Sequence, residues 1–139
     1  GSARYVRRPF PTEEMTVESL KIVLTGETPS KKNSRVVDRR TGRTFPSAAF
    51  RKWHDEKVFE ALTNCRGGIP QPPLKIRFEF THGDLRRRDS DNQASSVLDL
   101  MVDTKIIPDD GWNVVRNIEI ANGYEKGKPS VTVEISAAE

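Results

Sequence analysis

Alternating apolar and polar residues predict four β-strands. At the first of them, Leu20, Ile22 and Leu24 are separated by Lys21 and Val23. A period of two residues is typical of a strand that buries one face. Comparable apolar residues recur in three later segments. The four predicted strands cover residues 20–24, 76–80, 114–120 and 131–135.

Two further segments have the three- and four-residue spacing of amphipathic helices. The first helix is predicted to start after Ser47, a good N-cap residue, and to run to about Asn64. The second is predicted over residues 92–105, with Asp91 as its N-cap. Their apolar stripes include Phe50, Trp53, Val58, Ala61, Leu62 and Cys65 in the first, and Ala94, Val97, Leu98 and Met101 in the second.

The order strand, helix, strand, helix, strand, strand predicts an α+β fold, a small mixed β-sheet with the two main helices packed on one face. The chain has 139 residues, which favours one domain, expected over residues 17–139. Residues 1–16 are interpreted as a cloning scar, Gly1-Ser2, and an irregular basic arm. Residues 27–46 form a long loop, in which a short hairpin would pair 36–37 with 43–45.

Charge is concentrated in that loop, although the net charge of the whole chain is only +3. Residues 31–43 contain six basic side chains against a single acid, Asp38. Any one of them could simply be solvated, but six together favour a phosphate partner. The six are Lys31, Lys32, Arg35, Arg39, Arg40 and Arg43.

Cys65 is the only cysteine, which excludes an internal disulfide and a zinc site built on cysteines. No apolar stretch is long enough to span a membrane, and no signal peptide is visible. These observations fit a cytoplasmic protein.

The most informative segment is Arg86-Arg87-Arg88-Asp89-Ser90-Asp91-Asn92, followed downstream by Asp109-Asp110. Neighbouring carboxylates repel one another, and a hard divalent cation such as Mg²⁺ would relieve the repulsion. Asp89 and Asp91, two residues apart in extended chain, are expected to point to one side. A metal on acids framed by arginines suits phosphodiester cleavage. The simpler reading is that Asp91 caps the helix and Asp89 pairs with an arginine.

The two acidic groups are separated by the second predicted helix. Fourteen helical residues span roughly 20 Å, and residues 106–110 reach roughly 15–18 Å when extended. The acids therefore meet within one chain only if the helix is short. The alternative is a site completed by a second subunit.

Other polar and aromatic residues carry weaker signals. His54 and His82 have no partner at the spacing of metal ligands, so both are expected to be surface or packing residues. Trp112 follows the Asp109-Asp110 turn, where it could lie at the rim of a site, although a place in the core is the main expectation.

The chain resembles the RusA family of Holliday junction resolvases, homodimeric Mg²⁺-dependent endonucleases of bacteria and their prophages. The resemblance extends from about Leu20 to Ile135, and its specific part is the arginine, acid and asparagine run with its downstream acid pair. The supporting residues are Pro29-Ser30, Gly42-Arg43-Thr44 with Ser47, Pro73-Leu74-Lys75-Ile76-Arg77 and Leu98-Asp99.

The resemblance implies that this chain resolves four-way branched DNA by paired symmetric phosphodiester hydrolysis, in DNA recombination and repair. Asp89, Asp91 and Asp110 would be both the catalytic acids and the ligands of Mg²⁺, or alternatively Mn²⁺. The protein would be a homodimer without an organic cofactor, acting in the bacterial cytoplasm at the nucleoid or encoded by a prophage. DNA would contact Lys31, Lys32, Arg35, Arg43, Arg86, Arg87 and Arg88.

One position departs from the family pattern. The family usually has a lysine three residues after the motif asparagine, where this chain has Ser95. Such a lysine would bring a cation to the scissile phosphate, and Lys31, Lys32, Arg87 or Arg88 would have to replace it. The departure leaves an alternative function open, that of a branched-DNA-binding protein of the same fold that does not cleave.

Overall fold

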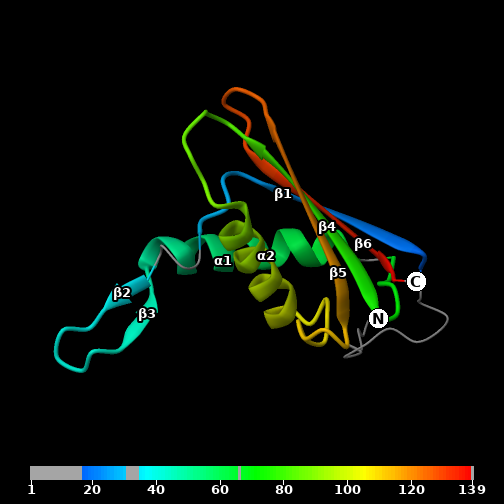
Figure 1. The fold of residues 1–139 in the computed structure, drawn as a ribbon, viewed down its shortest axis with the longest axis horizontal. Helices are drawn as coiled ribbons and strands as arrows, with labels where there is room; N and C mark the ends of the chain where they lie inside the picture. The colour runs from blue at the N-terminus through cyan, green and yellow to red at the C-terminus, as the bar shows by residue number, and fades with distance from the viewer. Residues whose placement is uncertain (1–16, 31–34, 66, 139) are drawn as a thin grey trace.

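The computed structural model describes residues 17–30, 35–65 and 67–138. They form a four-stranded sheet, a separate two-stranded hairpin and two helices (Figure 1). The elements are β1 Ser19–Thr25, β2 Arg35–Val37, β3 Thr44–Pro46, α1 Ala48–Thr63, β4 Leu74–His82, α2 Ser90–Asp103, β5 Val115–Tyr124 and β6 Ser130–Ala137. The α+β class and all four predicted strands are confirmed.

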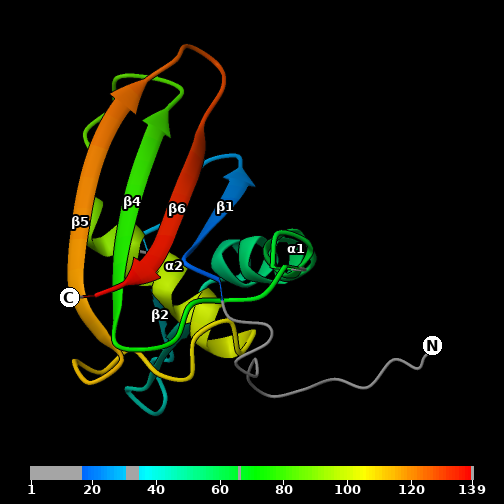
Figure 2. The same ribbon diagram turned by 90° about the vertical axis from the view of Figure 1, so that its right-hand side faces the viewer.

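The main sheet is mixed and has the strand order β1-β6-β4-β5. β6 runs antiparallel to both β1 and β4, whereas β5 runs parallel to β4. Parallel neighbours need a crossover connection, and α2 provides it between β4 and β5. Figure 2 shows the four strands side by side, with β5 and β1 at the two edges.

The alternation along the strands divides the sheet into an apolar and a charged face. Ile76, Phe78 and Phe80 of β4 are buried in the core with residues of both helices. On the other face Arg77 forms ion pairs with Glu79 and Glu119. Both helices lie on the apolar side, as predicted (Figure 1).

One helix starts where the sequence predicts, and the other starts earlier. Helix α1 begins after Ser47, whose hydroxyl oxygen accepts a hydrogen bond from the Phe50 backbone N–H, as expected. Helix α2 begins two residues earlier than predicted, with Asp89 rather than Asp91 at the N-cap. The reason lies in the backbone, because the carbonyl of Asp89 already accepts hydrogen bonds from Asn92 and Gln93.

The structure also tests the predictions for the short hairpin and for Trp112. The short hairpin is confirmed as β2–β3, which projects away from the main sheet (Figure 1). The expectation that Trp112 lies in the core is wrong, since its side chain is 79% exposed in the turn before β5. No helix within the described residues is long and apolar enough to cross a membrane.

Candidate functional site

The acidic segment lies at the end of the loop that joins β4 to α2 and in the first turn of α2. Asp89 is the N-cap of α2 and has extended backbone, but its carboxylate makes no capping hydrogen bond. Asp91 lies in the first turn of the helix, and both side chains are exposed. A helix N-terminus has a positive electrostatic potential and unpaired backbone N–H groups, so it favours anions. The two acids are therefore held at a polarised and accessible point.

The simpler interpretation, in which Asp91 caps the helix and Asp89 pairs with an arginine, is only partly confirmed. Asp89 lies 3.8 Å from Arg87 Nη2 and 3.5 Å from Asn92 Nδ2, which are weak contacts. Asp91 is not the cap. Our expectation that the pair lies on extended chain was also wrong, because Asp91 is helical and residues two apart on a helix do not share a face.

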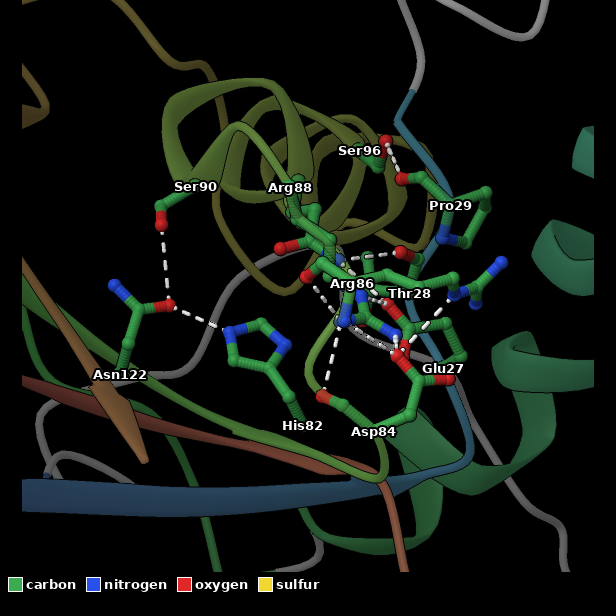
Figure 3. A network of polar contacts seen from close by, with 11 residues as sticks. Glu27, Thr28, Pro29, His82, Asp84, Arg86, Arg88, Ser90, Ser96 and Asn122 are labelled. Carbon is green, nitrogen blue, oxygen red and sulfur yellow. Dashed lines mark hydrogen bonds and ion pairs between the residues drawn. The ribbon is translucent and has the colours of Figure 1, made fainter. Parts of the chain in front are cut away.

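The three arginines before Asp89 have different roles. The side chain of Arg88 is only 11% exposed and forms ion pairs with Glu27, at 2.6 Å, and Asp84, at 2.7 Å (Figure 3). Its guanidinium also donates to the backbone carbonyl of Arg86. In contrast, Arg87 is 92% exposed. Arg88 therefore fixes the conformation of the loop, whereas the side chain of Arg87 is available to contact a ligand.

The charges in this loop stabilise one another. Burial alone would lower the pKa of Arg88, but hydrogen bonds to Asp84 and Glu27 raise it above the ordinary arginine value. Hydrogen bonds from the Arg86 backbone N–H and the Arg88 side chain lower the pKa of Asp84 from 3.8 to about 2. The loop is thus fixed by groups that stay ionised over a wide pH range.

Buried side chains of α2 attach the helix to the segment after β1. The amide nitrogen of Gln93 donates to Glu27 at 2.9 Å and to the carbonyl of Thr28 at 2.8 Å. The hydroxyl of Ser96 donates to the carbonyl of Pro29 at 2.7 Å (Figure 3). This packing sets the direction in which the chain leaves β1 toward the basic loop.

Residues at the C-terminal ends of β4 and β5 also contact the start of α2. Asn122 Oδ1 lies 2.7 Å from His82 Nε2 and accepts a hydrogen bond from the Ser90 hydroxyl at 3.1 Å. His82 also stacks on Phe80, so it is a packing residue, as expected. Gly83 follows, and a Cβ there would lie 2.8 Å from the Pro129 ring. The residue that precedes the acidic loop therefore has to be small.

The second acidic pair forms a turn before β5. Asp109 Oδ2 accepts a hydrogen bond from the Gly111 backbone N–H at 3.0 Å, and the Gly111 carbonyl accepts from Val114 and Val115. Asp109 is thus a turn residue. The side chain of Asp110, by contrast, is exposed to solvent.

Asp110 and the first acidic pair lie at opposite ends of α2. Leu74, at the start of β4, pairs with Val115 at the start of β5, whereas Asp89 follows the end of β4. The helix between them has 14 residues and is roughly 20 Å long. Within the described residues, the only group of three potential ligands within 4.8 Å excludes all three predicted acids. Within the described residues of one chain, the ligand atoms of Asp89, Asp91 and Asp110 therefore do not form a cluster.

The basic loop is only partly described. Lys31 and Lys32 lie outside the described residues, and for Arg35 only the backbone is described, in β2. Arg39, Arg40 and Arg43 are exposed at the tip of the β2–β3 hairpin. Asp38, the single acid, shapes that tip by accepting from the Arg40 backbone N–H.

Several residues around the site were not foreseen. Glu27, Gln93 and Asn122 position the acidic loop through contacts between distant segments, for which the sequence holds no local signal. The ligand group noted above consists of His54, Asp99 and Asp103. Its two aspartates lie four residues apart in a predicted helix, and that spacing was a signal that could have found them.

Comparison with known proteins gives one informative match. The chain is 23% identical over 107 residues to "Crossover junction endodeoxyribonuclease RusA" of Aquifex aeolicus (strain VF5). The match covers 77% of this chain and 83% of that protein. No protein-family model matches the chain. The similarity in sequence agrees with the acidic motif and the α+β fold, and it supports membership of the RusA family.

Proposed function

We propose that the protein is a metal-dependent endonuclease that resolves Holliday junctions. The observation that carries the proposal is the pair of exposed carboxylates, Asp89 and Asp91, on a rigid helix N-terminus beside the exposed guanidinium of Arg87. The Aquifex relative is named as a crossover junction endodeoxyribonuclease, which supports the same chemistry and substrate for this chain.

Asp89 and Asp91 fit a role as the first ligands of Mg²⁺. Mg²⁺ is commonly bound by one or two carboxylates, with water and substrate phosphate completing its coordination. When bound, the ion would supply an activated water and neutralise charge on the phosphate. The protein's own part is to hold both carboxylates exposed and in place, and the contacts of Arg88 and Gln93 with Glu27 support it by fixing the loop and the helix that carry them.

Asp110 would join this site from a second copy of the chain. Asp110 follows the C-terminal end of α2, whereas Asp91 lies in its first turn, and this separation argues against a site built within one chain. Trp112, two residues after Asp110, and Ile118, on the edge strand β5, are exposed apolar side chains that a homodimer would cover. A twofold dimer would also present two equivalent sites to the two related strands of a junction.

DNA phosphates would be bound by the exposed cations on either side of α2. Arg87 lies beside Asp89 and would supply the cation that the family lysine gives at the position of Ser95. The hairpin arginines, including Arg43, would hold a more distant part of the junction with Lys31, Lys32 and Arg35. Arg86 is exposed although it pairs with Asp84, so it would bind phosphate after exchanging partners. Arg88 would act indirectly, by positioning this loop.

The test is cleavage of a synthetic four-way junction in Mg²⁺, beside a linear duplex of the same sequence. Paired symmetric nicks in the junction that disappear in Asp91→Asn would support the proposal. An Asp55→Asn variant is the matched control, because Asp55 is an exposed helical aspartate on α1, away from the acidic loop. Nicking that survives Asp91→Asn would refute the assignment of the site.

A non-cleaving junction-binding protein is the second candidate. Ser95 favours it, because this exposed residue lies one helical turn after Asp91 and brings no charge to the site. It predicts tight junction binding with no nicking in Mg²⁺ or Mn²⁺. If Ser95 is the cause, Ser95→Lys should restore cleavage to that protein.

A further inference from the structure

His54, Asp99 and Asp103 form a polar cluster that the proposed nuclease does not use. One ligand atom from each side chain lies within 4.8 Å of the other two. His54 is on α1, whereas Asp99 and Asp103 are four residues apart on α2, so that they share a face of that helix. We propose that this cluster binds a divalent transition-metal ion of the zinc class and fastens α1 to α2.

The imidazole of His54 is oriented as a metal ligand needs to be. Its Nε2 lies 2.8 Å from Asp103 Oδ2, in a side chain that is only 17% exposed. Its ring packs against the buried Phe50 ring, with centroids 6.2 Å apart. Because α1 holds the ring in place, a metal could replace the proton shared with Asp103 with little rearrangement.

The other nitrogen of the ring faces a second carboxylate. His54 Nδ1 lies 3.9 Å from Asp55 Oδ1. Histidines that bind metals commonly direct their second nitrogen toward a carboxylate, which fixes the ring and makes the ligating nitrogen more basic. At 3.9 Å the Asp55 carboxylate is too far for a hydrogen bond and acts on the ring through its charge alone, so it is the 2.8 Å contact between Nε2 and Asp103 Oδ2 that marks Nε2 as the ligating atom.

The composition of the cluster selects the kind of ion. One imidazole and two carboxylates suit Zn²⁺, which takes nitrogen and oxygen ligands at about 2.0–2.2 Å, and leave one position for water. Mg²⁺ prefers oxygen ligands alone. The three carboxylates near His54, those of Asp55, Asp99 and Asp103, also favour a cation electrostatically.

This site is separate from the proposed nuclease site. Asp103 ends α2 and Asp91 lies in its first turn, about 18 Å away along the helix axis. Helix α1 follows β3 directly, and α2 carries the acidic motif at its start. A metal between the two helices would therefore fix the basic hairpin relative to the acids.

Metal binding can be tested on the full-length protein after treatment with a chelator. Titration with Co²⁺, an ion that reports its ligands by visible absorption, should saturate at one ion per chain when excess Mg²⁺ is present to occupy the proposed nuclease site. Zn²⁺ should compete for the same place. At a free Zn²⁺ concentration one hundred times Kd, the thermal midpoint should rise by roughly 5–15 °C.

Four variants locate the ion. His54→Gln and Asp103→Asn should each weaken Co²⁺ binding at least tenfold, because loss of even an outer-shell partner of a metal ligand typically costs about 10–100-fold in affinity. His82→Gln, which removes the other histidine, and Asp91→Asn should leave the Co²⁺ spectrum unchanged. Asp91→Asn should at the same time abolish Mg²⁺-dependent nicking, so a failure of either proposal is recognised independently of the other.

The proposal is overturned if wild-type protein gives no saturable Co²⁺ spectrum, or if His54→Gln binds Co²⁺ as wild type does. In either case the cluster is an ion pair between helices. Asp103→Asn preserves the shape of a side chain that is 54% exposed, so it should fold even if His54→Gln does not. Comparing each variant with and without metal separates loss of binding from loss of stability.

Discussion

Replacing Arg88 by alanine should destabilise the protein, whereas the same change at Arg87 should not. Arg88 donates hydrogen bonds to two carboxylates and to the backbone carbonyls of Arg86 and Asp84, and its side chain is nearly buried. Arg87 has one ion pair, at 3.8 Å, and is exposed to solvent. The two variants remove the same side chain, but only the guanidinium of Arg88 makes several hydrogen bonds within the fold.

The size of the effect follows from these contacts. Removing one partner of a fully buried ion pair costs about 3–5 kcal/mol. Glu27 and Asp84 remain partly open to water after the change, so solvent would compensate part of this loss. We therefore expect Arg88→Ala to lower the free energy of unfolding by about 2–3 kcal/mol, and Arg87→Ala by less than about 0.5 kcal/mol.

Urea unfolding followed by tryptophan fluorescence measures both variants, because Trp53 is buried in the core and reports its loss. Junction binding measured at several salt concentrations gives the opposite ranking. Arg87→Ala should reduce the salt dependence by about one phosphate contact and leave stability unchanged. Equal urea midpoints for wild type and Arg88→Ala would refute the division of roles between the two arginines.

Three further predictions concern the frame of the site. Gly111→Ala should cost about 0.5–1 kcal/mol of stability by urea unfolding, because its Cβ, built 2.7 Å from Asp109 Oδ2, would displace that oxygen and weaken the hydrogen bond that it accepts from the Gly111 N–H, whereas Gly67→Ala has nothing within 4 Å to meet and should be neutral. Ser47→Ala should cost about 1 kcal/mol through loss of the α1 cap, and an unchanged thermal midpoint would contradict it. The pKa of Asp84 in the folded protein, about 2, lies below its ordinary 3.8, so its carboxylate stabilises the fold above that value and the contribution is lost as the pH falls toward 2. The urea midpoints of wild type and Asp84→Asn should therefore converge with falling pH, and a gap that stays constant would exclude this linkage.

The main elements of the fold could be predicted because each has a local cause. The apolar alternation of Ile76, Phe78 and Phe80 marks β4, and the Ser47 cap marks the start of α1. The placement of β6 between β1 and β4 has no such cause. It depends on pairing between segments far apart in the chain, which periodicity does not encode.

The site could be predicted less well, for a related reason. The motif singled out Asp89 and Asp91, but it gave no sign that Arg88 turns inward to Glu27, a residue 61 positions away. Asp91 was wrongly expected at the N-cap because both aspartates suit that position, and only the backbone hydrogen bonds distinguish them. The sequence did raise the difficulty of joining Asp91 to Asp110, through the length of the helix between them.

That difficulty leads to the central claim, that one nuclease site combines acids from two chains. Asp91→Asn and Asp110→Asn should each be inactive when purified alone. A mixed dimer holds one site in which both acids are lost and one in which both are intact. If the site lay within a single chain, every site in the mixed dimer would lack one acid.

The most direct measurement is therefore junction nicking by the two variants mixed after co-refolding. We predict that the mixture nicks one strand of a four-way junction in Mg²⁺, although neither variant does so alone. A mixture as inactive as its components, with dimer exchange verified by differently tagged chains, would contradict a site shared between two copies.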